Sequence, residues 1–102
     1  MYIYKAAVVG AGAMGAEIAQ VISFSGVPVI LKDVDQTFVD RGLGVIRKIY
    51  QRRVDRGKMT ADELEQKMAL VTGATTYDAL KDVDVVIEAV PEKAGLKQQV
   101  FR

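Results

Sequence analysis

The 102-residue sequence contains no cysteine and no histidine. Without cysteine, the chain can form no disulfide, no thiolate nucleophile and no thiolate metal site. Without histidine, it lacks the side chain most often used as a general base and as a transition-metal ligand. Oxygen ligands remain, but no acidic loop has the spacing of a calcium site. We therefore predict no metal site and no catalytic residue within this chain.

Long apolar runs and a strong charge of one sign are also missing. No run approaches the roughly eighteen residues needed to cross a bilayer. The apolar start, residues 1–9, leads directly into a glycine-rich turn and lacks the features of a signal peptide. The formal net charge is only +1, which gives no reason to expect nucleic acid or an anionic membrane as a partner. We expect a cytoplasmic protein that binds neither.

Half of the residues are apolar, enough for the core of one small domain. Short apolar runs typical of strands buried on both faces occur at residues 6–9, 27–31, 69–72 and 83–90. Helical patterns with start and stop signals lie between them, at residues 14–25, 35–56, 60–67 and 77–81. This alternation predicts an α/β fold, a Rossmann-type doubly wound parallel sheet of about four strands in order 3-2-1-4, with a helical hairpin after strand 2.

Apolar spacing also predicts which helix faces are buried. The first helix would bury Met14, Ile18, Val21 and Ile22, and the long helix would bury Val39, Leu43, Ile46, Tyr50 and Val54. After Pro91 we expect a final helix whose apolar positions are Leu96, Val100 and Phe101.

The predicted sheet is incomplete, because a full dinucleotide fold has six strands. We therefore expect residues 1–102 to be the N-terminal part of a dinucleotide-binding domain from a longer protein. In that arrangement the last predicted strand would have an exposed apolar edge, and copies of the chain would pair through residues 85–90.

A glycine-rich turn follows the first predicted strand and opens the first predicted helix. In such a turn the first glycine allows the sharp bend, the second lets the backbone approach a pyrophosphate, and the third lets helix and strand pack closely. The helix N-terminus then directs its free N–H groups at the phosphates. We predict that a dinucleotide binds here, on residues Gly10, Ala11, Gly12, Ala13, Met14 and Gly15.

Asp33 lies eighteen residues after Gly15, just past the second predicted strand, close to the roughly 20 expected for a ribose-binding carboxylate. A carboxylate there accepts hydrogen bonds from ribose hydroxyls and repels a 2′-phosphate, so it favours NAD over NADP. A turn or helix-capping role is the alternative, but Asp35 can cap the next helix instead. Lys32 should point to the opposite side of the sheet.

These motifs resemble the NAD-binding domain of 3-hydroxyacyl-CoA dehydrogenases along the whole chain. The resemblance includes the glycine turn through Gln20, the segments 56–60 and 77–84, and above all residues 85–92, Val-Val-Ile-Glu-Ala-Val-Pro-Glu. It implies NAD-dependent oxidation of L-3-hydroxyacyl-CoA to 3-ketoacyl-CoA in fatty-acid β-oxidation. It also implies that Glu92 and Lys97 contact NAD, although Lys93 and Leu96 depart from the family pattern. The alternative for that pair is an exposed first turn of the last helix.

The resemblance names a reaction that the chain's own residues cannot complete. The family removes the 3-hydroxyl proton with a histidine, which is absent here, so we expect cofactor binding without turnover. The alternatives are a stand-alone nucleotide-binding or interaction module, or another Rossmann dehydrogenase of the 6-phosphogluconate or nucleotide-sugar type. The segment Glu-Ala-Val-Pro-Glu at residues 88–92 argues against both of these dehydrogenase types.

Two charged features stay open at this point. Glu88 sits in a predicted buried strand, and it either bonds to a neighbouring loop or contacts a ligand. Between Arg41 and Lys58 seven cationic residues and one acidic residue give a charge of +6. That stretch is either a solvated helix face or a surface that attracts the phosphates of coenzyme A; nucleic acid is disfavoured because no aromatic platform accompanies the charges.

Overall fold

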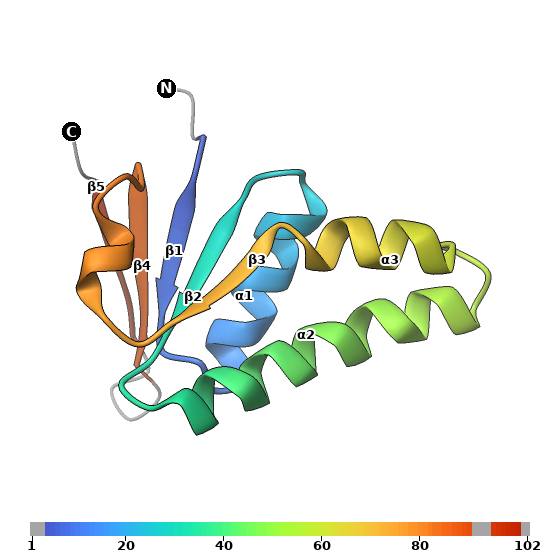
Figure 1. Cartoon of the computed structure of the whole chain (residues 1–102), viewed down its shortest axis with the longest axis horizontal. Coiled ribbons are helices and arrows are strands. Elements are labelled where there is room, and N and C mark those ends of the chain that lie inside the picture. Colours follow the sequence, from blue (N-terminus) through green and yellow to red (C-terminus); the bar gives the residue numbers. More distant parts are fainter. Residues whose placement is uncertain (1–3, 91–94, 101–102) are drawn as a thin grey trace.

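The computed structural model describes residues 4–90 and 95–100. Figure 1 shows one sheet with its α-helices gathered on one side, and with the α2–α3 hairpin extending away from the strands. The elements, in chain order, are β1 (Ala6–Val9), α1 (Ala13–Phe24), β2 (Val29–Lys32), α2 (Gln36–Asp55), α3 (Ala61–Met68), β3 (Val71–Ala74), the 3-10 helix η1 (Tyr77–Leu80), β4 (Val85–Val90) and β5 (Gly95–Val100).

The sheet has the order β3-β2-β1-β4-β5. β1 to β4 are mutually parallel, with Ala6 level with both Val29 and Val85. The predicted α/β class, the order 3-2-1-4 and the helical hairpin after β2 are therefore confirmed. Parallel pairing brings the carboxyl ends of β1, β2 and β4 to one edge of the sheet, which is where ligands bind in such folds.

Each central strand is buried on both faces, as its apolar run predicts. Val8 and Leu31 point into a core formed with α1, α2 and α3, whereas Ala7 and Ile30 point into a smaller core that includes Leu80. Successive residues of a strand face opposite sides, so the two cores separate cleanly. On α2 the predicted face is confirmed: Val39, Ile46 and Tyr50 are fully buried, and Leu43 and Val54 pack against the core.

The predicted buried face of α1 is partly wrong. Met14 and Val21 are 41% and 63% exposed, while Ile18 and Ile22 are half-buried. The buried face carries small and polar residues instead: Gly15, Ala16, Ala19, Gln20 and Ser23. The reason is the close approach of α1 to the sheet and to α2, which small residues permit and large ones do not.

The segment after β4 is also different from the prediction. Residues 95–100 form β5, which pairs antiparallel with β4, Glu88 lying opposite Lys97 and Val85 opposite Val100. Leu96 and Val100 are four positions apart, a spacing that fits both a helix and a strand. β5 occupies the edge of β4 that we expected to be exposed, so the predicted self-association through residues 85–90 loses its basis. The remaining edges of the sheet are β3 and β5.

The hairpin of α2 and α3 has the predicted start signals at both helices. Asp35 caps α2 by accepting a hydrogen bond from the Thr37 N–H at 2.7 Å. At α3, Thr60 and Glu63 each accept from the other's backbone N–H, at 3.1 and 2.9 Å, and these bonds hold the pKa of Glu63 below its ordinary value. Paired caps of this kind satisfy N–H groups that a helix start leaves open.

Candidate nucleotide-binding site

The glycine turn begins where β1 ends, at the carboxyl edge of the sheet. Gly10 has φ +107°, a conformation that side chains disfavour, and its N–H donates to the Lys32 carbonyl at 2.8 Å. A Cβ on Gly10 would lie 2.4 Å from the Ala89 carbonyl oxygen. The backbone therefore requires glycine here both for the bend and for close passage beside β4.

The other two glycines of the motif have contrasting surroundings. A Cβ on Gly15 would lie 1.7 Å from the Gly10 carbonyl oxygen, so α1 can pack on the turn only without a side chain there. Gly12 has an ordinary φ of −68°, and a Cβ on it would meet no protein atom within 4 Å. Nothing in the fold of the described residues demands a glycine at position 12. A glycine at this position is instead explained by a ligand that approaches the backbone from outside and needs the space of a side chain.

The start of α1 is open to an anion. Gly12 is the N-cap, and no side chain accepts a hydrogen bond there. The first-turn N–H groups of a helix have no partners within the helix, and the helix dipole places partial positive charge beside them. A phosphate group is the ligand that such a turn and helix start together favour.

Asp33 joins the end of β2 to the glycine turn. Its carboxylate accepts from the Ala11 N–H at 2.8 Å and from the Val34 N–H at 2.6 Å. Since a carboxylate has about four lone-pair sites, capacity remains for two ribose hydroxyls. Asp35, not Asp33, caps α2. Lys32 points to the other face, where its Nζ lies 3.8 Å from the centre of the Tyr77 ring, as expected.

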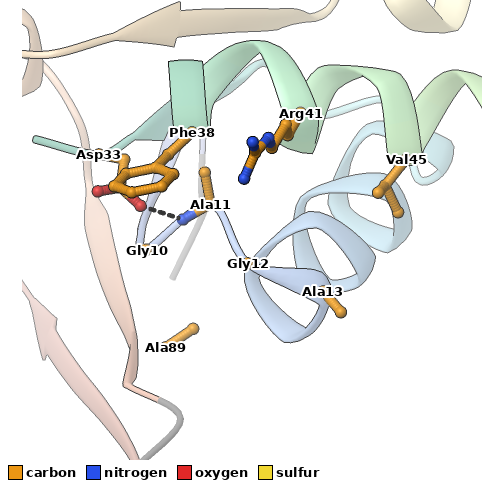
Figure 2. A pocket seen from close by; sticks show the side chains of 9 residues that line it. All are labelled: Gly10, Ala11, Gly12, Ala13, Asp33, Phe38, Arg41, Val45 and Ala89. Atoms are coloured by element: carbon orange, nitrogen blue, oxygen red, sulfur yellow. Dashed lines mark hydrogen bonds between the residues drawn. The ribbon is translucent and has the colours of Figure 1, made fainter. Parts of the chain in front are cut away.

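These residues enclose a cleft of about 430 Å³, which Figure 2 shows from close by. Phe38, a residue that is 46% exposed, presents an apolar ring beside Asp33, and the Arg41 guanidinium points toward the turn. The lining residues are Gly10, Ala11, Gly12, Ala13, Asp33, Phe38, Arg41, Val45 and Ala89.

Four of these lining residues were missed by the sequence prediction: Phe38, Arg41, Val45 and Ala89. A signal for the α2 wall does exist in the sequence, namely Gly42 in the middle of a helical pattern. A Cβ on Gly42 would lie 2.7 Å from Leu31 Cδ2 and 2.9 Å from the Ala11 carbonyl oxygen. An isolated glycine inside a helix often marks such a close approach, and here it brings α2 against the turn.

Two predicted site residues lie away from the lining of the cleft. Met14 lines a shallow groove on the outer side of α1, although its backbone belongs to the first turn of that helix. Gly15 is buried under the turn, where it serves packing.

The remaining predicted residues belong to the part of the sequence from β4 onward. Glu92 lies outside the described residues. Lys97 is in β5 rather than in a helix, and it is level with Glu88 of β4, which is in turn level with Val9 at the end of β1. Glu88 itself is half-buried.

The cationic stretch of α2 has several roles rather than one. Arg47 pairs with Glu65 of α3 at 2.9 Å, and this hydrogen-bonded pair raises the pKa of Arg47 and lowers that of Glu65. The guanidinium carbon Cζ of Arg53 lies over the Phe24 ring, 4.5 Å from its centre. Arg41 and Arg47 are both exposed, as a solvated helix face requires, and Arg41 also lines the cleft.

Within the described part of the chain, no helix is long and apolar enough to cross a membrane. No group of three or more acidic, histidine or cysteine side chains that could hold a metal ion occurs among the same residues.

Comparison with known proteins adds an independent line of support. Residues 5–102 match the family described as 3-hydroxyacyl-CoA dehydrogenase, NAD binding domain. The chain is 43% identical over 99 residues to the peroxisomal fatty acid beta-oxidation multifunctional protein MFP2 of Arabidopsis thaliana, and 40% identical over 99 residues to the fatty acid oxidation complex subunit alpha of Colwellia psychrerythraea. Each alignment covers 97% of this chain and 14% of the relative, so the chain spans about a seventh of their length.

A solved structure resembles the fold over most of the chain. The crystal structure of (S)-3-hydroxybutyryl-CoA dehydrogenase PaaH1 from Ralstonia eutropha superposes with a TM-score of 0.85 at 34% identity. The match covers 89% of this chain and 32% of that one.

Proposed function

Because this chain belongs to the 3-hydroxyacyl-CoA dehydrogenase family, as its NAD-binding domain, we propose that the cleft between the glycine turn, Asp33 and α2 is where it holds NAD. Gly12 and the start of α1 would hold the diphosphate, and the Asp33 carboxylate would accept hydrogen bonds from a ribose. Glu92 and Lys97 make further contacts with the cofactor. The observation that carries this proposal is Gly12, a glycine with ordinary φ and open space where a side chain would be.

The whole protein, we propose, oxidises L-3-hydroxyacyl-CoA to 3-ketoacyl-CoA in fatty-acid β-oxidation. When bound, NAD would supply the hydride acceptor for that chemistry. The residues of this chain bind and orient the cofactor: the turn holds the phosphates, and Asp33 orients the ribose. The hydroxyl proton needs a base within hydrogen-bond reach, and we assign that base to residues outside these 102, since the chain has no histidine.

The compartment belongs to the same proposal. We place the protein in the cytoplasm, while the relative from Arabidopsis thaliana is named peroxisomal. Microscopy of the tagged protein in its own cells distinguishes the two, and a signal confined to an organelle would rule out the cytoplasm.

The test of the cleft compares two glycines that both face open space. Gly12→Ala adds a methyl group where the diphosphate would approach, and Gly44→Ala adds one on α2, where a Cβ also meets nothing within 4 Å. We expect calorimetric titration to show NAD affinity at least about tenfold lower for Gly12→Ala, a loss of roughly 1.4 kcal/mol or more, and unchanged affinity for Gly44→Ala.

Stability measurements separate a binding effect from a folding effect. Gly12→Ala should change the free energy of unfolding by less than about 1 kcal/mol, because alanine is poorer at an N-cap but restricts the unfolded chain. Gly44→Ala should raise it by about 0.5–1 kcal/mol, as in a helix interior. Unimpaired NAD binding by Gly12→Ala would contradict the proposed site.

A further inference from the structure

We propose that Arg41 is the side chain that binds the cofactor's diphosphate, reaching it from α2 across the glycine turn. The inference rests on the proposed function, since it takes the cleft to be the NAD site. It adds to the backbone N–H groups of the turn a charged ligand that the glycine motif does not contain.

The first argument is the charge of the cleft. Only two lining residues carry a formal charge, Asp33 and Arg41. Asp33 by itself would give the lining a charge of −1 and would oppose the approach of a diphosphate that carries two negative charges. Arg41 brings the formal charge of the lining to zero and is the one cation among the residues that line the cleft.

The second argument is the position of Arg41 on α2. The neighbouring residue, Gly42, is buried against Leu31 and the Ala11 backbone so tightly that a Cβ would not fit. This contact holds the backbone of α2 against the turn at that point. Figure 2 shows the Arg41 guanidinium directed to the side of Ala11 and Gly12, whereas Phe38 is the α2 residue that lies beside Asp33.

The third argument is that Arg41 is available for a ligand. The ion pairs found among the described residues join Arg47 to Glu65 and Lys81 to Asp78. The adjacent carboxylate of Asp40 accepts from the Gln36 side chain at 2.8 Å. Arg41 is exposed, and neither of the ion pairs found among the described residues includes it.

The chemistry of the side chain favours a phosphate. The planar guanidinium presents paired N–H donors that match two oxygens of one phosphate group, and charge-assisted bonds of this kind are the stronger hydrogen bonds in proteins. A 2′-phosphate could use the same donors. The Asp33 carboxylate next to the ribose opposes a phosphate there, so the diphosphate is the ligand that we assign.

The test compares two arginine variants that change the net charge equally. Arg41→Gln removes the proposed ligand, and Arg52→Gln removes a cation that lines a separate groove on the same helix. Binding of NAD, ADP, adenosine and NADP to the full 102-residue chain is measured by calorimetry at one ionic strength. Arg41→Lys keeps the positive charge but loses the paired N–H donors of the guanidinium. Thermal unfolding confirms that each variant is folded.

We expect Arg41→Gln to weaken NAD and ADP by about tenfold or more and to leave adenosine within about twofold. Arg41→Lys should fall between wild type and Arg41→Gln, and Arg52→Gln should match wild type. Equal losses of NAD affinity for Arg41→Gln and Arg52→Gln would overturn the inference, because they would show that Arg41 acts only through the net charge of the protein and not through contact with the diphosphate. A loss confined to NADP would also overturn it, by placing Arg41 at the 2′ position.

The two proposals fail in different ways. If wild type binds neither NAD nor ADP, the proposed site fails, and the Arg41 assignment fails with it. If wild type binds both ligands and Gly12→Ala weakens them while Arg41→Gln does not, the site stands and only the Arg41 assignment is wrong.

Discussion

At the scale of single residues, Asp33 is held in place by the protein itself. Both of its oxygens accept backbone hydrogen bonds, one from the Ala11 N–H of the glycine turn and one from the N–H of the next residue in the chain, Val34. The carboxylate is therefore oriented within the apoprotein, and less ordering is required when a ribose binds. The same bonds tie the end of β2 to the turn, so Asp33 shapes the proposed phosphate site as well as the proposed ribose site.

We predict that Asp33→Asn changes the choice of cofactor more than it changes the fold. The amide oxygen can still accept from the Ala11 N–H, but the negative charge that opposes a 2′-phosphate is gone. NAD should bind about tenfold more weakly, and the preference for NAD over NADP should fall by a similar factor. Parallel titrations with NAD and NADP measure the two affinities. An unchanged preference would show that Asp33 does not contact the ribose that distinguishes the two cofactors.

At the scale of elements, Tyr50 joins α2 to α1. Its fully buried hydroxyl lies 2.6 Å from Ser23 Oγ and donates to the Gln20 carbonyl at 3.1 Å. Burial raises the pKa of Tyr50 above 10.0, against the opposing effects of these hydrogen bonds. The small buried residues of α1 leave room for this ring, which helps to hold α2 close enough for its first turns to line the cleft.

The raised pKa makes stability depend on alkaline pH. The unfolded chain loses the Tyr50 proton near the ordinary value of 10.0, while the folded chain retains it, so the unfolded state binds fewer protons in that range. The free energy of unfolding should therefore be fully maintained below pH 10 and should fall as the pH rises toward the folded-state pKa.

Tyr50→Phe tests both effects. At neutral pH it should lower the free energy of unfolding by about 1 kcal/mol, through loss of the hydroxyl bonds. Above pH 10 the variant should lose stability less steeply than wild type. Urea unfolding at several pH values measures the slopes, and the other three tyrosines, which are common to both proteins, serve as the internal control. Identical slopes would contradict the prediction.

At the scale of the whole molecule, the parallel sheet gathers the site from segments far apart in sequence. The turn after β1, Asp33 after β2, and Ala89 in β4 meet at the carboxyl edge, and residues of α2 line one side of the cleft (Figure 2). A ligand that contacts all of these segments links most of the fold. Cofactor binding should consequently stabilise the domain as a unit.

We predict that NAD at about 100 times its Kd stabilises the chain by roughly 2.7 kcal/mol, which for a domain of this size corresponds to a rise in Tm of about 13 °C. Nicotinamide alone lacks the diphosphate and should give no shift. No NADH should form when 3-hydroxybutyryl-CoA is added, because the chain has no histidine base. Turnover by the chain alone would show that another residue removes the proton.

The sequence by itself determined the features that depend on local order along the chain. The strand, the Gly10–Gly15 turn, the helix and Asp33 follow one another at spacings that only a parallel βαβ unit accommodates, and the capping residues Asp35 and Thr60 act within a few positions of themselves. Strand order and cofactor class follow from these signals because each depends on neighbours in sequence and on the general handedness of such units.

The tertiary structure decided everything that depends on a partner distant in sequence. Residues 95–100 became a strand because β4 offers open backbone groups to pair with, which local spacing cannot reveal. The buried face of α1 is set by how closely α2 and the sheet approach it, so small residues are inside and Met14 is outside. Arg41 and Phe38 line the cleft only because Gly42 lets α2 pack directly on the glycine turn, a contact between residues thirty-one positions apart.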